Sequence, residues 1–145
     1  MGKPKVMVAV RNADSVESLV TLSCQLASAI DGELTALHVV EVPPATPLDA
    51  AAEVLDYPGE KLLTQAKRVA ERLSNQISTQ LVRAREVGEA IVGEAKNQGV
   101  DLLVVGHHRP HPPILGEISL GSTLQFVARH APCRVIVQIP PPEHG

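Results

Sequence analysis

Aromatic side chains are almost missing from this sequence of 145 residues, which contains one Tyr, one Phe and no Trp. Proteins that bind nucleic acids commonly stack bases on aromatic rings and carry an excess of basic side chains. Here the formal net charge is −3, from 13 basic and 16 acidic residues. Because both features are lacking, we expect no nucleic-acid partner.

Cysteines and long apolar segments are scarce as well. Cys24 and Cys133 lie in apolar surroundings, which predicts two reduced, buried thiols rather than a disulfide or a metal-binding pair. No apolar run is long enough to cross a bilayer, and residues 1–5 lack the apolar region of a secretory signal. We therefore expect a cytoplasmic protein without membrane insertion.

What the sequence does contain is a regular alternation of strand and helix patterns. Strands are predicted at 5–10, 34–42, 79–86, 102–105 and 134–139, and helices at 14–30, 60–77, 88–95 and 121–130. Strands that alternate with helices along a chain of this length predict one α/β domain with a parallel sheet. The Pro- and Ala-rich connection 43–58 is predicted to be a lid or contact surface, with a short helical turn near 48–55.

Local signals refine the ends of these elements. Asp14 followed by Glu17 resembles a capping box at the start of the first helix. Gly32 is expected to take the left-handed conformation that ends this helix. Charged side chains at Arg83 and Arg85 predict that the third strand lies at an edge of the sheet.

The segment 101–123 is the most informative part of the chain. Four apolar residues, Leu102 to Val105, predict a strand that is buried on both faces and ends at Gly106. A loop rich in Pro and His follows, and Gly121-Ser122-Thr123 then begins an amphipathic helix. This order presents free backbone N–H groups and the positive end of a helix to an anion.

These residues resemble the universal stress protein family. Nucleotide-binding members carry two glycines separated by two residues after the fourth strand, then nine residues and a Gly-Ser/Thr pair. In this sequence Gly106 matches the first glycine, and Gly121 with Ser122 matches the closing pair. Arg109 stands in place of the second glycine, and eleven residues separate it from Gly121. The motif is therefore present at both ends and altered in the middle.

The resemblance covers nearly the whole chain and implies a flavodoxin-like fold. It implies an open five-stranded parallel sheet of order 3-2-1-4-5, with helices on both faces. The single α/β domain would occupy residues 1–139, and residues 140–145 would form a flexible tail. A ligand in such a sheet lies beyond the carboxyl ends of the strands, where the strand order reverses.

The expected ligand is ATP or another adenine nucleotide, with or without Mg²⁺. With the strand order above, the site lies between the first and fourth strands. The residues predicted to line it are Arg11, Asn12, Val40, Gly106, His107, Arg109, Gly121, Ser122 and Thr123.

Two arginines make the outcome at this site ambiguous. Nucleotide-binding relatives usually carry an Asp just after the first strand, where this chain has Arg11-Asn12. The side chain of Arg109 either blocks the phosphates, since glycine alone allows a close backbone approach, or holds an anion with its guanidinium group. The first reading predicts loss of ATP binding, and the second predicts a rebuilt anion site.

Metal binding and catalysis have little support in the sequence. His107, His108 and His111 share one loop, but no Cys or carboxylate lies at a standard ligand spacing from them. The chain has no Gly-x-Ser-x-Gly nucleophile motif and no Walker A motif. We therefore predict no metal site and no enzymatic activity.

Association is the remaining feature that the sequence predicts. The fifth strand is apolar, and the resemblance implies a homodimer formed through this edge, with Val135 and Val137 at the contact. Two functional hypotheses follow. The first is a nucleotide-binding sensor or regulator. The second is a dimeric module that binds no nucleotide and regulates a partner protein, such as a membrane transporter, through segments 43–58 and 107–116.

Overall fold

The computed structural model describes residues 2–49, 53–107 and 121–141. It contains a five-stranded sheet in which neighbouring strands are parallel and the strand order is β3-β2-β1-β4-β5. The strands are β1 Lys5–Ala9, β2 Glu33–Glu41, β3 Ser78–Ala84, β4 Leu102–Gly106 and β5 Arg134–Gln138. The predicted fold class and strand order are confirmed, and so is the edge position of β3.

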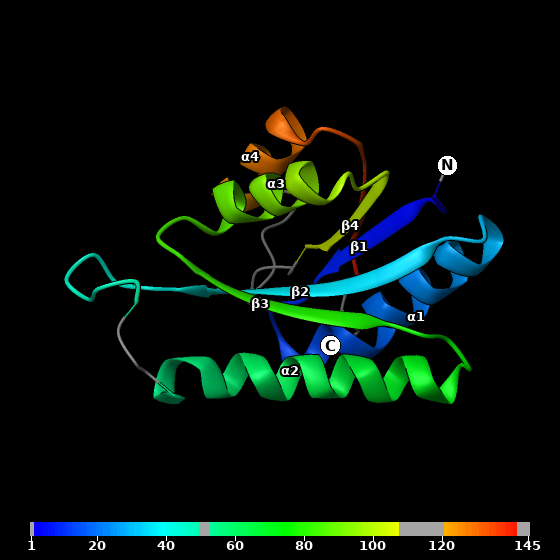
Figure 1. Cartoon of the computed structure of the whole chain (residues 1–145), viewed down its shortest axis with the longest axis horizontal. Helices are drawn as coiled ribbons and strands as arrows, with labels where there is room; N and C mark the ends of the chain where they lie inside the picture. Colours follow the sequence, from blue (N-terminus) through cyan, green and yellow to red (C-terminus); the bar gives the residue numbers. More distant parts are fainter. Residues whose placement is uncertain (1, 50–52, 108–120, 142–145) are drawn as a thin grey trace.

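The helices cover both faces of this sheet (Figure 1). They are α1 Ala13–Ala29, α2 Glu53–Arg72, α3 Val87–Gln98 and α4 Ser122–His130. One core cluster joins α1 and α2 to a face of the sheet, and a second joins α3 and α4 to the other. Within the described residues, no helix is both long enough and apolar enough to cross a membrane.

The central strands are apolar on both sides because each side faces a pair of helices. In β1, Val6 and Val8 belong to the α1–α2 core, whereas Met7 belongs to the α3–α4 core. In β4, Val104 belongs to the α1–α2 core and Leu103 to the α3–α4 core. All five side chains are at most 1% exposed. This two-sided burial explains why these segments read as continuous apolar runs.

The predicted bounds of the second helix were wrong at both ends. The helix α2 begins at Glu53 rather than at residue 60, and it contains Pro58. The Pro- and Ala-rich composition of 43–58 had predicted a connection there, since a proline inside a helix removes one backbone hydrogen bond. The helix ends at Arg72 rather than at residue 77, because Ser74 adopts a φ of 56° that turns the chain away.

Two local signals at the first helix were also wrong. The helix α1 begins at Ala13, and its N-cap residue Asn12 makes no side-chain cap hydrogen bond, so Asp14 does not form the expected capping box. The left-handed residue at its end is Asp31, with a φ of 52°, rather than Gly32. Glycine is needed at position 32 for another reason, since a Cβ there would lie 2.9 Å from the carbonyl oxygen of Pro4.

Candidate functional site

Most of the predicted site residues lie where the carboxyl ends of β1 and β4 meet. These strands pair from Val6 with Leu102 to Ala9 with Val105, so their ends are adjacent. Arg11 and Asn12 follow β1 and lead into α1, on one face of the sheet. Gly106 ends β4, and Gly121 immediately precedes α4, which covers the opposite face. The helices next to these neighbouring strand ends thus lie on opposite faces of the sheet, which is the arrangement at which open parallel sheets bind ligands. We call this place, between the ends of β1 and β4 and the start of α4, the crevice.

The predicted residues differ strongly in exposure. Arg11, Asn12, Gly121 and Ser122 are exposed, and Thr123 is half-buried. The remaining two described side chains are covered: Val40 is 6% exposed and His107 is 7% exposed. The backbone N–H of His107 donates to the carbonyl oxygen of Gln138 over 2.8 Å, so this amide is already used by the sheet. The exposed residues are thus better placed than the buried ones to contact a ligand.

The start of α4 presents backbone hydrogen-bond donors that the helix itself does not use. Gly121 is the N-cap residue and makes no side-chain cap hydrogen bond, and the first-turn amides that follow it have no acceptor within the helix. A Cβ built on Gly121 would meet no atom within 4 Å, and one on Gly106 would touch Leu19 at an ordinary 3.5 Å. The packing of the described residues therefore does not require glycine at either position.

The middle of the altered motif lies outside the described residues. This applies to Arg109 and to the histidines His108 and His111. Among the residues that the structure does describe, no group of three His, Cys, Asp or Glu side chains could hold a metal ion. His38 has a structural role, because its Nδ1 lies 2.8 Å from the carbonyl oxygen of Val10.

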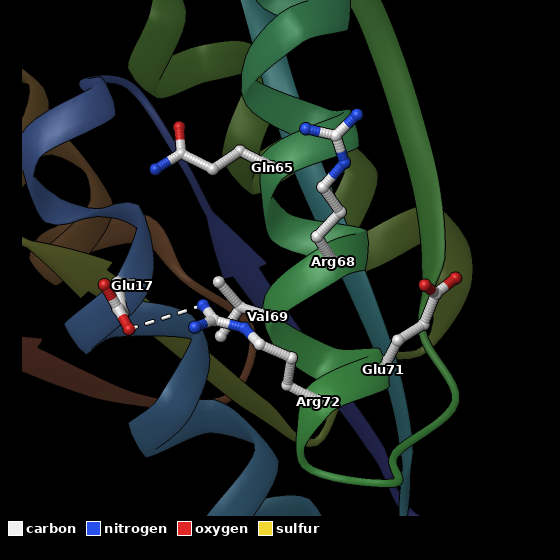
Figure 2. A pocket seen from close by; sticks show the side chains of 6 residues that line it. All are labelled: Glu17, Gln65, Arg68, Val69, Glu71 and Arg72. Atoms are coloured by element: carbon white, nitrogen blue, oxygen red, sulfur yellow. Dashed lines mark hydrogen bonds and ion pairs between the residues drawn. The ribbon is translucent and has the colours of Figure 1, made fainter.

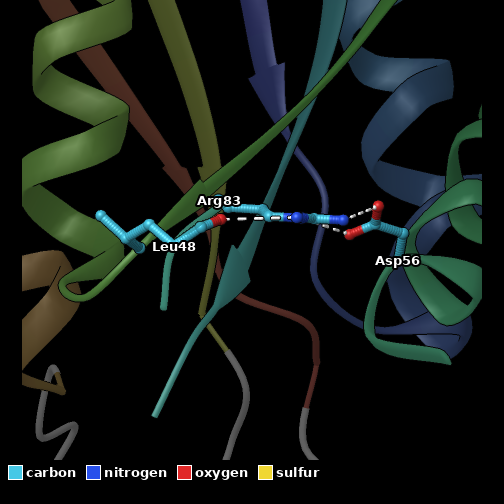
Figure 3. Close-up of polar contacts among 3 residues, drawn as sticks. All are labelled: Leu48, Asp56 and Arg83. Carbon is cyan, nitrogen blue, oxygen red and sulfur yellow. Dashed lines mark hydrogen bonds and ion pairs between the residues drawn. The ribbon is translucent and has the colours of Figure 1, made fainter. Parts of the chain in front are cut away.

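The sequence-based prediction missed a polar clamp at the carboxyl end of β3. The guanidinium group of Arg83 donates to both carboxylate oxygens of Asp56, over 2.9 and 2.6 Å, and to the carbonyl oxygen of Leu48 over 3.4 Å (Figure 3). Arg85 donates to the carbonyl oxygens of Pro43 and Thr46. The two arginines therefore attach the connection after β2, and the start of α2, to the edge strand.

The ion pair of this clamp is mostly buried, and each partner stabilises the charged form of the other. The side chains of Arg83 and Asp56 are 23% and 19% exposed. The hydrogen bonds from Arg83 lower the pKa of Asp56, and those to Asp56 raise the pKa of Arg83. The charged residues of β3 mark the edge, as predicted, but each also has a defined partner. The signal was the pair of arginines at alternate positions near the strand end, facing a Pro-rich connection.

A hollow of about 900 Å³ lies between the start of α1 and the first half of α2. We call it the α1–α2 hollow. Its walls include Arg11, Asn12 and Asp14 from the α1 side and Tyr57, Lys61 and Arg68 from the α2 side. It begins at the same Arg11-Asn12 pair that borders the crevice, whereas Val40, Gly106 and Gly121 do not line it. The sequence analysis did not predict this hollow, because it assigned Tyr57 and Pro58 to the connection 43–58 and gave no binding role to the helix predicted at 60–77.

A smaller depression follows along the same helix pair (Figure 2). In this view Arg72 of α2 extends toward Glu17 of α1, and Nη2 lies 3.3 Å from Oε1. Both side chains are more than 60% exposed, so the ion pair adds little to stability. Gln65 Nε2 donates to the carbonyl oxygen of Ala13 over 3.3 Å, which ties α2 to the first turn of α1. These two contacts join α1 and α2 along this side of the protein.

The cysteines do not supply a reactive group. Both are free thiols; Cys24 is buried as predicted, and Cys133 is half-buried. Burial raises the pKa of both thiols, and the charge of Asp101 raises that of Cys133 further. A raised pKa lowers the fraction of nucleophilic thiolate at neutral pH.

Comparisons with known proteins agree with this architecture. A family profile described as "Universal stress protein family" matches residues 4–138. Universal stress protein A homolog 2 from Coxiella burnetii is 30% identical over 137 residues, covering 91% of this chain and 92% of that protein.

Two solved structures are similar over most of their length. A universal stress protein in complex with cAMP has a TM-score of 0.70 and 25% identity, covering 96% of this chain and 98% of that one. The universal stress protein from Archaeoglobus fulgidus in complex with dAMP has a TM-score of 0.70 and 17% identity, covering 94% and 97%. At its lower identity the second structure shows similarity of fold alone.

Proposed function

Because this chain belongs to the universal stress protein family, we propose that it is a regulatory module that binds an adenine nucleotide at the carboxyl edge of its sheet. The observation that carries this proposal is the solved relative in complex with cAMP, which is 25% identical and covers 96% of this chain. The cAMP of that relative supports adenine nucleotides as the ligand class.

The exposed residues of the crevice suit an anionic ligand. Arg11 makes no ion pair with any carboxylate of the described residues, and Asn12 supplies an amide group beside it. The start of α4 would contribute its first-turn amides and the hydroxyls of Ser122 and Thr123 to the same ligand. Phosphate at a helix start is stabilised by these N–H groups and by the helix dipole. Arg109 would add a guanidinium group, and ATP with Mg²⁺ belongs to the candidate ligands.

The proposed role is sensing or regulation in the cytoplasm rather than catalysis. A nucleotide-hydrolysing site needs a group that activates water or a nucleophile. Among the described residues of the crevice, no carboxylate or thiol occupies such a position, and His107 is 7% exposed. Binding without turnover allows occupancy to follow the nucleotide concentration.

A second candidate function rests on β5, the outermost strand on one side of the sheet. The strand β5 pairs with β4 on one side, and no described strand pairs with its other side. We propose that two copies pair through this edge as a homodimer. If the chain binds no nucleotide, the dimer would act as an interaction module for a partner protein, such as a transporter.

A thermal-shift panel separates the two functions. The purified chain is heated with ATP, ADP, AMP, cyclic AMP or cyclic-di-AMP, with and without Mg²⁺. A ligand at a hundred times its Kd stabilises the folded state by about 2.7 kcal/mol, which raises the midpoint by roughly 5–10 °C for this size. A shift with an adenine nucleotide is expected. No shift with any of the five would overturn nucleotide binding and favour the interaction module.

Variants then locate the site. Arg109→Ala and Arg11→Ala should weaken binding, and Ser122→Ala should weaken it less because the backbone amides remain. Arg129→Ala is the control, since Arg129 is exposed in the last turn of the same helix α4. Equal affinity for all four variants would contradict the assignment of the crevice.

A further inference from the structure

We propose that Gln138, the last residue of β5, is a positioning residue that fixes the two walls of the crevice relative to each other. One wall is the start of α1 with Asn12, and the other is the end of β4 with His107. This inference rests on the proposed function. It adds a residue that acts on the bound nucleotide through its neighbours.

Gln138 makes a hydrogen bond to each of the two elements that carry these walls. Its carbonyl oxygen accepts from the backbone N–H of His107, directly after β4, over 2.8 Å. Its side-chain Nε2 donates to Ser18 Oγ of α1, also over 2.8 Å. Because Val135 and Val137 pack in the α3–α4 core and side chains alternate along a strand, the Gln138 side chain lies on the face that α1 covers. One residue of the edge strand thus joins β4 to α1.

Hydrogen bonds continue from Ser18 to the start of α1. Ser18 Oγ donates to the carbonyl oxygen of Ser15 over 3.4 Å. Ser15 in turn donates to the carbonyl oxygen of Asn12, from its backbone N–H over 3.2 Å and from its hydroxyl over 3.1 Å. The contact that Gln138 makes with α1 is therefore linked, through two serines of the first turns, to the residue that borders the crevice.

The side chain of Gln138 also lowers the stability of the protein. Its Oε1 is buried and accepts no hydrogen bond from the residues that the structure describes. Turning the amide by 180° would leave the nitrogen unpaired at the same place. A buried polar atom without a partner destabilises the folded state, and an apolar side chain would avoid this loss. The neighbours Val137 and Ile139 are apolar, so stability alone does not explain a glutamine between them.

A side chain that lowers stability is typical of functional sites, where a local rule is broken for the sake of geometry. The groups proposed to hold the nucleotide lie on both walls of the crevice. A ligand that contacts two walls binds more tightly when their separation is already fixed, because less motion is lost on binding. Gln65 attaches the first turn of α1 to α2, whereas Gln138 attaches this helix to β4 and β5. Gln138 therefore controls the separation that the nucleotide spans.

Calorimetry with the five nucleotides of the thermal-shift panel tests this role. Gln138→Met keeps the length of the side chain and removes its hydrogen bond to Ser18. We expect the Kd to rise roughly two- to tenfold, the equivalent of one ordinary hydrogen bond. The urea midpoint should equal or exceed that of the wild type, because the unpaired acceptor is removed as well. A lower midpoint with an unchanged Kd would mean that Gln138 only stabilises the fold, and would overturn the proposal.

Ser18→Ala removes the same contact from the side of α1. It should raise the Kd by a similar factor, and the double variant with Gln138→Met should show no further loss, because both changes break one contact. Additive losses in the double variant would contradict the link between these two residues. Gln25→Met is the matched control. Gln25 is exposed in the same helix and takes no part in these contacts, so its replacement should leave the Kd unchanged.

The wild type separates failure of this inference from failure of the proposed function. If it binds one of the nucleotides and Gln138→Met binds that nucleotide equally well, Gln138 is not a positioning residue and the proposed function stands. If the wild type binds none of the five, both are overturned. Circular dichroism and sedimentation equilibrium verify that Gln138→Met keeps the fold and the mass of the wild type.

Discussion

At the scale of single residues, Gly59 shows how tightly α2 approaches the sheet. A Cβ at this position would lie 2.4 Å from His38 Cδ2 and 3.1 Å from a methyl group of Leu81. The ring of His38 cannot withdraw freely, because its Nδ1 is bonded to the carbonyl oxygen of Val10. Alanine normally stabilises a helix by about 1 kcal/mol relative to glycine, but overpacking typically costs about 1–3 kcal/mol. We predict that Gly59→Ala destabilises the protein by about 1–2 kcal/mol.

Gly93 provides the opposite case for the same substitution. It lies inside α3, and a Cβ there would meet no atom within 4 Å. Gly93→Ala should therefore stabilise the protein by up to about 1 kcal/mol. Urea unfolding of both variants measures the two effects, as shifts of the midpoint at an unchanged slope. If Gly59→Ala also raised the midpoint, the close contact with His38 would be wrong.

For single residues, the sequence predicted positions within a helix or strand better than contacts with residues far away in the chain. Gly121 and Ser122 were expected at a helix start and lie there, because that signal is local. The partners of Arg83 could not be predicted, since Asp56 and Leu48 are 27 and 35 positions away. Asp14 and Glu17 fitted a capping pattern, yet the helix begins two residues earlier than this pattern requires.

At the scale of elements, the position of α2 depends on the ion pair between Arg83 and Asp56. Hydrogen bonds from Arg83 lower the pKa of Asp56 in the folded protein. The pair therefore stabilises the folded state above the unfolded pKa of about 3.9, and this contribution is lost as the pH falls through the lowered folded pKa. We predict that Asp56→Asn is less stable than the wild type at pH 7. The difference should shrink below about pH 4.

Urea midpoints of both proteins across this pH range test the prediction. Glu60→Gln is the control, because Glu60 is an exposed carboxylate of the same helix without an ion pair to a described residue. Its effect should be small at every pH. An equal loss at pH 7 for the two variants would show that Asp56 contributes only as a general helix charge.

The elements themselves were largely predictable, and the failure at α2 has a physical cause. Buried strands and amphipathic helices repeat their apolar residues with distinct periods, so their order along the chain is clear from the sequence. Pro58 interrupted this pattern and suggested a loop before residue 60. The first turns of α2 are stabilised by tertiary contacts, namely Asp56 with Arg83 and Gly59 with His38. The hollow escaped prediction for the same reason, since its wall begins in these turns.

At the scale of the whole molecule, the two edges of the sheet differ in how they are protected. The outer edge β3 is attached through Arg83 and Arg85 to the connection after β2. The outer edge β5 has no partner strand among the described residues. Its side chains Val135 and Val137 are half-buried against the α3–α4 core, so they point toward the protein's own interior. A dimer through β5 would therefore use backbone groups of the edge more than these side chains.

Backbone direction identifies the groups that such a dimer would need. The carbonyl oxygen of Gln138 accepts a hydrogen bond from the backbone N–H of His107, directly after β4, so the backbone groups of Gln138 point toward β4. Along a strand, successive residues direct their backbone groups to opposite sides. The N–H groups of Val135 and Val137 therefore point outward, to the open edge.

Val137→Pro removes one outward donor and leaves the pairing with β4 intact, a substitution that edge strands tolerate. We predict a dimer for the wild type and a monomer, or at least a tenfold weaker dimer, for Val137→Pro, measured by sedimentation equilibrium. Ile136→Pro removes an inward donor and should unfold the edge instead, which separates loss of pairing from loss of structure. A monomeric wild type, or a Val137→Pro variant with unchanged dimer affinity, would exclude pairing through this strand.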